Sequence, residues 1–144
     1  PEAFELTRAV NAGCGFACTV HANSAVDALH AIVNAALMAG ENVGESVVRK
    51  VFESSIDIVV HLDRDSIPQR ESERLRRQVM EIAAVVPARR EDFSTAPIFT
   101  RQSLGSPLDW TGSFPPVQLS DIIDRSLTSG IDLRALLEGR ASPA

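Results

Sequence analysis

The residue best suited to chemistry is His21, in a segment that reads Cys-Thr-Val-His-Ala-Asn-Ser over residues 18–24. A histidine can donate a hydrogen bond to an anion and can gain or lose a proton near neutral pH. Ser24 and Asp27 have the form of a helix capping box, which predicts that a helix begins just after His21. Helix N-termini favour phosphate, so the pattern predicts an anion site at His21. The alternative is a histidine that packs at the end of a strand against backbone carbonyls, and the spacing alone leaves both roles open.

The other candidate residues favour structural roles. His30 falls on the polar side of its predicted helix, where we expect it to be solvated, and His61 falls in mid-strand, which favours a core or interface position. Asp57 alternates with two isoleucines, and we expect it to pair with an arginine. Cys14 and Cys18 lack the cluster of His and Cys ligands that a zinc site needs. We therefore predict no metal site and two reduced cysteines that serve as packing residues.

The size and charge of the chain exclude several classes of protein. It has 144 residues and a formal net charge of −5, which suits one domain with a hydrophobic core. No apolar run approaches the roughly 20 residues that span a bilayer, so no transmembrane segment is predicted. The basic residues form no dense cluster with aromatics between them, which argues against a nucleic-acid binder. The chain opens at Pro1 on a helix pattern without an initiating Met, so we expect a fragment of a longer protein.

Hydrophobic periodicity predicts the elements that must position these residues. Residues 16–21 alternate and are expected to form a strand that ends at His21. A further strand is expected over residues 93–101, at an edge or with a bulge because Pro97 cannot donate to a neighbour. The other predicted elements are helices over residues 1–10, 26–37, 47–52, 119–127 and 133–137, strands over 56–62 and 79–86, a loop over 63–72, and a strand with a turn over 107–116. This order predicts an α/β fold with a parallel part first and an antiparallel extension after it.

Five short motifs follow one another in the order in which a family of ATPases carries them. They read EAFELTRAVNAG over residues 2–13, CTVHANS over 18–24, AVDAL over 25–29, SSIDIVVHL over 54–62 and RRQVMEI over 76–82. Residues 1–87 thereby resemble the second half of the motor domain of the type II/IV secretion ATPases, the CpaF-type branch in particular. In this resemblance the second motif corresponds to the family's histidine box.

The chain departs from the family's pattern in several places. It has no G-x-x-x-x-G-K-[ST] phosphate-binding loop, and its single lysine, Lys50, lies in a predicted helix. The acidic strand on the magnesium side is also absent, and Cys14 stands where the family usually has a histidine. The resemblance therefore implies a partial RecA-like P-loop NTPase core without its Walker A half, with antiparallel C-terminal strands and short helices. Residues 1–87 would form the second half of that ATPase domain, and residues 88–144 an extension packed on it.

The resemblance also implies a function, that of a C-terminal fragment of an ATPase that couples ATP hydrolysis to pilus assembly or secretion. His21 would be the catalytic residue, as a sensor of the terminal phosphate, with Thr19, Asn23 and Ser24 beside the nucleotide. The full-length parent would use ATP and Mg²⁺, whereas this chain alone is expected to hold no cofactor and to be inactive. The implied partners are further copies in a hexamer and inner-membrane platform proteins, without nucleic acid. The implied location is cytoplasmic, peripheral to the inner membrane.

Two alternatives stay open beside this hypothesis. One is a degenerate homologue that binds partners without turning over nucleotide. The other is an unrelated small α/β enzyme that uses His21 as an acid or base, which requires a carboxylate partner that the sequence does not identify. A phosphate-binding loop upstream of Pro1 in the parent gene would separate the first hypothesis from the degenerate homologue.

Overall fold

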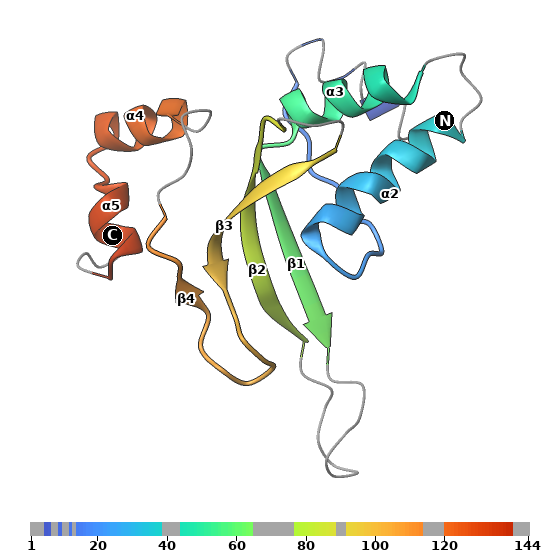
Figure 1. Ribbon diagram of the computed structural model, residues 1–144. Helices are drawn as coiled ribbons and strands as arrows, with labels where there is room; N and C mark the ends of the chain where they lie inside the picture. The colour runs from blue at the N-terminus through green and yellow to red at the C-terminus, as the bar shows by residue number, and fades with distance from the viewer. Residues whose placement is uncertain are drawn as a thin grey trace. The chain divides into compact units, whose positions relative to one another are not determined.

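The computed structural model describes residues 5–6, 9, 12, 14–38, 44–64, 77–88, 92–113 and 120–139. Within them the fold is mixed α/β, with short helices before and after a four-stranded sheet in the order β1-β2-β3-β4 (Figure 1). The elements are α2 (Ala25–Leu37), α3 (Glu45–Ser55), β1 (Ile58–Arg64), β2 (Arg77–Val86), β3 (Ser94–Thr100), β4 (Asp109–Trp110), α4 (Ser120–Thr128) and α5 (Leu133–Leu137). The predicted α/β class is confirmed.

Helix α2 begins where the sequence predicts it, directly after Ser24. The Ser24 backbone is extended, and its Oγ accepts a hydrogen bond from the Asp27 N–H at 3.0 Å. This bond satisfies one of the amide groups that a helix leaves unpaired at its first turn. The Asp27 carboxylate lies in that turn, where it complements the positive end of the helix dipole. The buried residues recur at helical spacing and form one apolar stripe: Ala25, Leu29, Ile32, Val33 and Ala36.

Helix α3 packs against α2 and confirms the helix predicted over residues 47–52 (Figure 1). Its buried residues are Val48 and Phe52, and Phe52 is fully buried. The apolar pattern of the sequence predicts that Val47 shares a face with Val48 and Phe52. Its side chain is instead 53% exposed, because Val47 lies one residue before Val48, about 100° around the helix. The Glu53 carboxylate accepts a hydrogen bond from the Ala88 N–H, which ties the end of α3 to the segment after β2.

The strands predicted over residues 56–62, 79–86 and 93–101 are confirmed as β1, β2 and β3. β1 and β2 are antiparallel, with Ile58 opposite Ala84 and an irregularity after His61. β3 and β4 are also antiparallel. The strand with a turn that we predicted over residues 107–116 is limited to the two residues of β4 within the described part of the chain.

β3 lies inside the strand order, so of the two alternatives predicted from Pro97 the edge position is wrong, and the bulge stays a prediction. β4 pairs only with Phe99 and Thr100, so it stops short of Pro97. The Pro97 carbonyl accepts a hydrogen bond from the Thr111 hydroxyl at 2.9 Å instead. A proline is tolerated in this strand because the neighbouring β4 is too short to need an N–H donor there.

The strand predicted over residues 16–21 is also wrong, because residues 14–22 have no regular secondary structure. Cys18 is exposed and Val20 is 42% exposed, so these alternating positions do not face a core. A strand needs a neighbour for its N–H and C=O groups, and the sheet formed by β1 to β4 does not include this segment. The parallel part that it was expected to begin is therefore not found among the described residues.

The helix predicted over residues 1–10 lies mostly outside the described residues, although Glu5, Leu6 and Ala9 are helical. The Cys14 N–H donates to the Ala9 carbonyl at 3.0 Å, a bond of the kind that closes a helix in a Schellman motif. Most of the predicted loop, residues 65–72, also lies outside the described part. The same holds for Gly40, a glycine that favours the end of the helix predicted over residues 26–37.

The two predicted C-terminal helices are confirmed as α4 and α5, which contact each other (Figure 1). Gly130, which follows the end of α4, has a φ of 78°. This conformation favours glycine, and the helix cannot continue through it. Asp132 then caps α5, since its carboxylate accepts a hydrogen bond from the Ala135 N–H at 2.9 Å.

The chain divides into two compact units. The first comprises residues 1–57 and 85–95, and its buried residues include the stripe of α2. The second comprises residues 58–84 and 96–144, where Ala84 and Ile98 are buried with Phe99 and Trp110 packed against them. The division between residues 1–87 and 88–144 stays a prediction. Among the described helices, none combines the length and the apolar character that crossing a membrane requires.

Candidate functional site

The histidine box lies in an irregular, exposed segment that leads directly into helix α2. Thr19, His21 and Asn23 are exposed, and Ser24 is half-buried at the helix cap. His21 therefore lies three residues before Ser24, the N-cap of α2, and it is exposed to solvent. The packing alternative for His21 required a strand end, and residues 14–22 form no strand.

Ser24 and Asp27 have opposite effects on the binding of an anion at the N-terminus of α2. The Ser24 oxygen accepts from the Asp27 N–H, and a hydroxyl that accepts a hydrogen bond can still donate its own hydrogen to an anion. Asp27 is exposed in the first turn of the same helix, and its carboxylate adds a negative charge to that turn. An anion here would gain from the amide dipoles and the Ser24 O–H, and would lose through repulsion from Asp27.

His21 has no acidic partner in the described part of the chain. None of the ion pairs found there involves His21, and no described side chain forms a hydrogen bond with it. General acid–base catalysis by a histidine typically relies on a carboxylate that orients the ring and stabilises its charged form. Among the described residues, His21 is therefore an accessible histidine without a carboxylate that contacts it.

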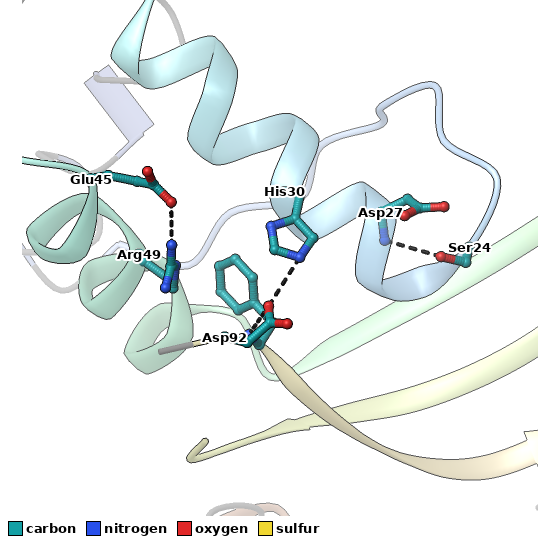
Figure 2. A network of polar contacts seen from close by, with 7 residues as sticks. Ser24, Asp27, His30, Glu45, Arg49 and Asp92 are labelled. Carbon is teal, nitrogen blue, oxygen red and sulfur yellow. Dashed lines mark hydrogen bonds and ion pairs between the residues drawn. The ribbon is translucent and has the colours of Figure 1, made fainter. Parts of the chain in front are cut away.

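A different histidine does meet a carboxylate, and sequence reasoning missed it. The Nε2 atom of His30, on α2, lies 3.1 Å from Oδ1 of Asp92, which precedes β3 (Figure 2). The His30 ring also meets the Phe93 ring edge to face, with centroids 5.4 Å apart. The His30 side chain is partly solvated, as expected, but the expectation did not include its contact with Asp92. His30 directly follows Leu29 and lies at the border of the buried stripe of α2. This position was the signal in the sequence that could have indicated a contact with another segment.

The Asp92 side chain has a second role. Its Oδ1 accepts a hydrogen bond from the Phe93 N–H at 2.7 Å, which fixes the turn before β3 and presents Phe93, a buried residue, to the interior. The His30 contact thus joins α2 to an already ordered turn. This arrangement stabilises the first compact unit and leaves both side chains partly exposed, at 41% for His30 and 62% for Asp92.

Another polar contact of the first compact unit lies within a single helix. Arg49 and Glu45 form an ion pair one turn apart on α3 (Figure 2). Glu45 lies in the first turn of that helix, so the pair supports α3 and complements its dipole.

Four further residues that the sequence analysis singled out have these outcomes. Cys14 and Cys18 are both free thiols and both exposed, so the expectation that they pack in the interior is wrong. They lie in the segment that forms no strand, which leaves no core for them to face. His61 is half-buried in β1 opposite Glu81 of β2. Asp57 is exposed, and the ion pairs of the described residues do not include the expected pair with an arginine.

Comparison with known proteins and the search for a metal centre add no further assignment. No protein-family model matches the chain, and no curated protein matches it. Within the described residues, no group of three or more His, Cys, Asp and Glu side chains could hold a metal ion.

Proposed function

We propose that this chain is the C-terminal part of a CpaF-type secretion ATPase, a motor that couples ATP hydrolysis to pilus assembly or export. The observation that carries the proposal is the placement of the histidine box. Its last residue, Ser24, caps helix α2, and His21 is exposed just before that helix end. A sensor of a terminal phosphate needs such a position, because it must be accessible and close to amide donors that favour an anion.

The roles of the chain's own residues follow from this placement. His21 would donate a hydrogen bond to the terminal phosphate, and the Ser24 O–H would donate from the helix cap. Thr19 and Asn23, both exposed, would line the same approach. Phosphoryl transfer depends mainly on positioning and on charge stabilisation, and a bound magnesium nucleotide would bring the reacting phosphate to these donors.

The described residues fit the phosphate of such a nucleotide and not its metal. The helix end offers donors, whereas the chain has no Gly-Lys-Ser/Thr loop to cradle the other phosphates. We propose that this loop and the magnesium-side acid belong to an upstream part of the parent, completing a RecA-like core. Hexameric assembly at the cytoplasmic face of the inner membrane, against platform proteins and without nucleic acid, belongs to the same proposal.

A reconstitution experiment tests this function directly. The chain alone should show no magnesium-dependent ATP hydrolysis above background. Addition of the separately purified upstream half of the parent should restore turnover, and the same mixture made with His21→Ala should lose most of it. His30→Ala is the matched control, because it removes the other histidine of this unit, which contacts Asp92 instead of lying in the box.

Two results would contradict the proposal. Hydrolysis by the chain alone would show that the site does not depend on an upstream loop. A parent gene that encodes no phosphate-binding loop would instead leave a homologue that binds partners without turnover.

A further inference from the structure

β1 presents an apolar edge of the sheet to solvent. It is the first strand in the order β1-β2-β3-β4, so only β2 pairs with it in the described sheet. Ile58, Val60 and Leu62 alternate along it and are 38%, 45% and 60% exposed. An exposed edge strand with an apolar row is a template for pairing with another strand.

The main chain of β1 has N–H and C=O groups directed toward the open edge of the sheet. The Val85 N–H donates to the Asp57 carbonyl at 3.0 Å, so the polar groups of Asp57 are directed toward β2. In an antiparallel ladder this direction alternates from residue to residue. The N–H and C=O groups of Ile58 and Val60 are therefore directed toward the open edge, away from β2.

The sequence of the strand complements itself in one antiparallel register. With a two-fold axis at Val59, Ile58 lies opposite Val60 of the partner subunit, and Leu62 lies opposite Ile56 of the partner subunit. On the other face, Asp57 lies opposite His61 of the partner subunit. On the exposed face the two Ile58–Val60 pairs then form an apolar ladder, which ends at the half-buried Ile56, the C-cap of α3. On the other face each Asp57 meets an imidazole.

The neighbouring registers are less favourable. A two-fold axis at Val60 places Asp57 opposite Asp63 of the partner subunit, and like charges directly opposite each other destabilise a sheet. An axis at His61 places Ile58 opposite Arg64 of the partner subunit and the two histidines opposite each other. A shift by a single residue in one strand alone would move the apolar row to the wrong face.

We propose that two copies of this chain pair antiparallel through their β1 edges, with the two-fold axis at Val59. The dimer extends the sheet across both subunits, and Ile58 and Val60 exchange their main-chain hydrogen bonds with the partner. The occupant of the edge is a second copy because the apolar ladder comes from β1, and the Asp57–His61 pairing comes from β1 and the residue directly before it. No residue of the histidine box takes part, so this proposal is independent of the proposed function.

Sedimentation equilibrium on the full chain tests the dimer. The wild type should show the mass of a dimer that dissociates on dilution, and Val60→Lys should show the mass of a monomer at the same concentrations. Val47→Lys is the matched control, since Val47 is a similarly exposed valine on α3, and it should remain dimeric. Circular dichroism checks that each variant is folded. A monomeric wild type at high concentration would overturn the proposal.

Disulfide trapping tests the register without relying on a disruptive variant. In a background with Cys14 and Cys18 changed to Ser, Val59→Cys should cross-link two copies on mild oxidation. Residues at a non-hydrogen-bonded antiparallel pair have Cα atoms about 4.5 Å apart, within the range that a disulfide spans. Leu62→Cys should not cross-link, because its counterpart lies far along the partner strand. Equal cross-linking at both positions, or capture of an upstream segment of the parent in place of a second copy, would contradict the proposal.

Discussion

The Nε2 atom of His30 lies 3.1 Å from Oδ1 of Asp92, and this contact links helix α2 to the turn before β3. Asp92 is held by its own bond to the Phe93 N–H, and Phe93 meets the His30 ring edge to face. A helix that follows the histidine box is thereby fixed to a segment distant in sequence. The contact lies within the first compact unit, to which the histidine box also belongs.

The strength of the His30–Asp92 contact can be measured by a double-mutant cycle with His30→Ala and Asp92→Asn. Asparagine keeps an oxygen that can accept from the Phe93 N–H, so the cycle measures what the charge of Asp92 contributes to its contact with His30. Both side chains are more than a third exposed, so we expect a coupling free energy of only about 0.2–1 kcal/mol. Urea denaturation of the four proteins measures it, and a coupling of zero would show that the two side chains do not hold each other in solution.

The packing of α3 predicts a much larger effect at Phe52. Its side chain is fully buried, so Phe52→Ala should lower the free energy of unfolding by about 3–5 kcal/mol. Val47→Ala, at an exposed position of the same helix, should change it by no more than about 0.5 kcal/mol. Thermal and urea unfolding compare the two, with Phe52→Leu as a milder variant that remains folded. Equal losses for Phe52→Ala and Val47→Ala would contradict the described core.

Local patterns explain which parts of the fold the sequence predicts. The start of α2 depends on Ser24 and on a stripe of residues spaced within one helix, and both are visible in a short window. The strand pattern of β2 is equally local, and its buried end at Ala83 and Ala84 fits a covered strand. Such elements were predicted because the residues that stabilise them are neighbours in the chain.

Contacts between distant segments explain the rest. The alternating pattern of residues 16–21 is short, and such a segment forms a strand only when it pairs with a neighbouring strand. The exposure of Cys14 and Cys18 follows from that missing neighbour. The His30–Asp92 contact joins residues from separate elements, and no spacing rule within one element could predict it.

The helix cap at Ser24 predicts a stability effect that can be separated from any role in binding. Ser24→Ala removes the acceptor for the Asp27 N–H and should cost about 0.5–2 kcal/mol. Ser24→Asp restores an acceptor and should retain near-native stability, while in the full-length parent its charge should weaken nucleotide binding. Ser46→Ala, an exposed serine in α3, controls for the loss of a hydroxyl. A Ser24→Ala protein as stable as the Ser46→Ala protein would show that the cap does not hold in solution.

The charge of Asp27 should oppose the binding of a phosphate at the same helix end. Asp27→Asn leaves the backbone N–H that Ser24 caps and removes only the carboxylate charge. In the full-length parent, nucleotide affinity should rise about two- to fivefold, which corresponds to ~0.3–1 kcal/mol. Glu45→Gln, in the first turn of α3, should leave the affinity unchanged. An unchanged affinity for Asp27→Asn in a nucleotide titration would place the phosphate away from α2.

The central claim, that His21 stabilises the terminal phosphate, is tested most directly by His21→Ala in the full-length parent. Turnover and melting temperature are measured on one preparation, with nucleotide affinity alongside. A donor that acts only as charge develops affects the rate constant and leaves ground-state binding nearly unchanged. We predict a loss of about 10²–10³ in turnover, or roughly 3–4 kcal/mol, with the melting temperature and affinity near those of the wild type. Unchanged turnover, whether or not the melting temperature falls, would contradict the account and remove His21 from the site.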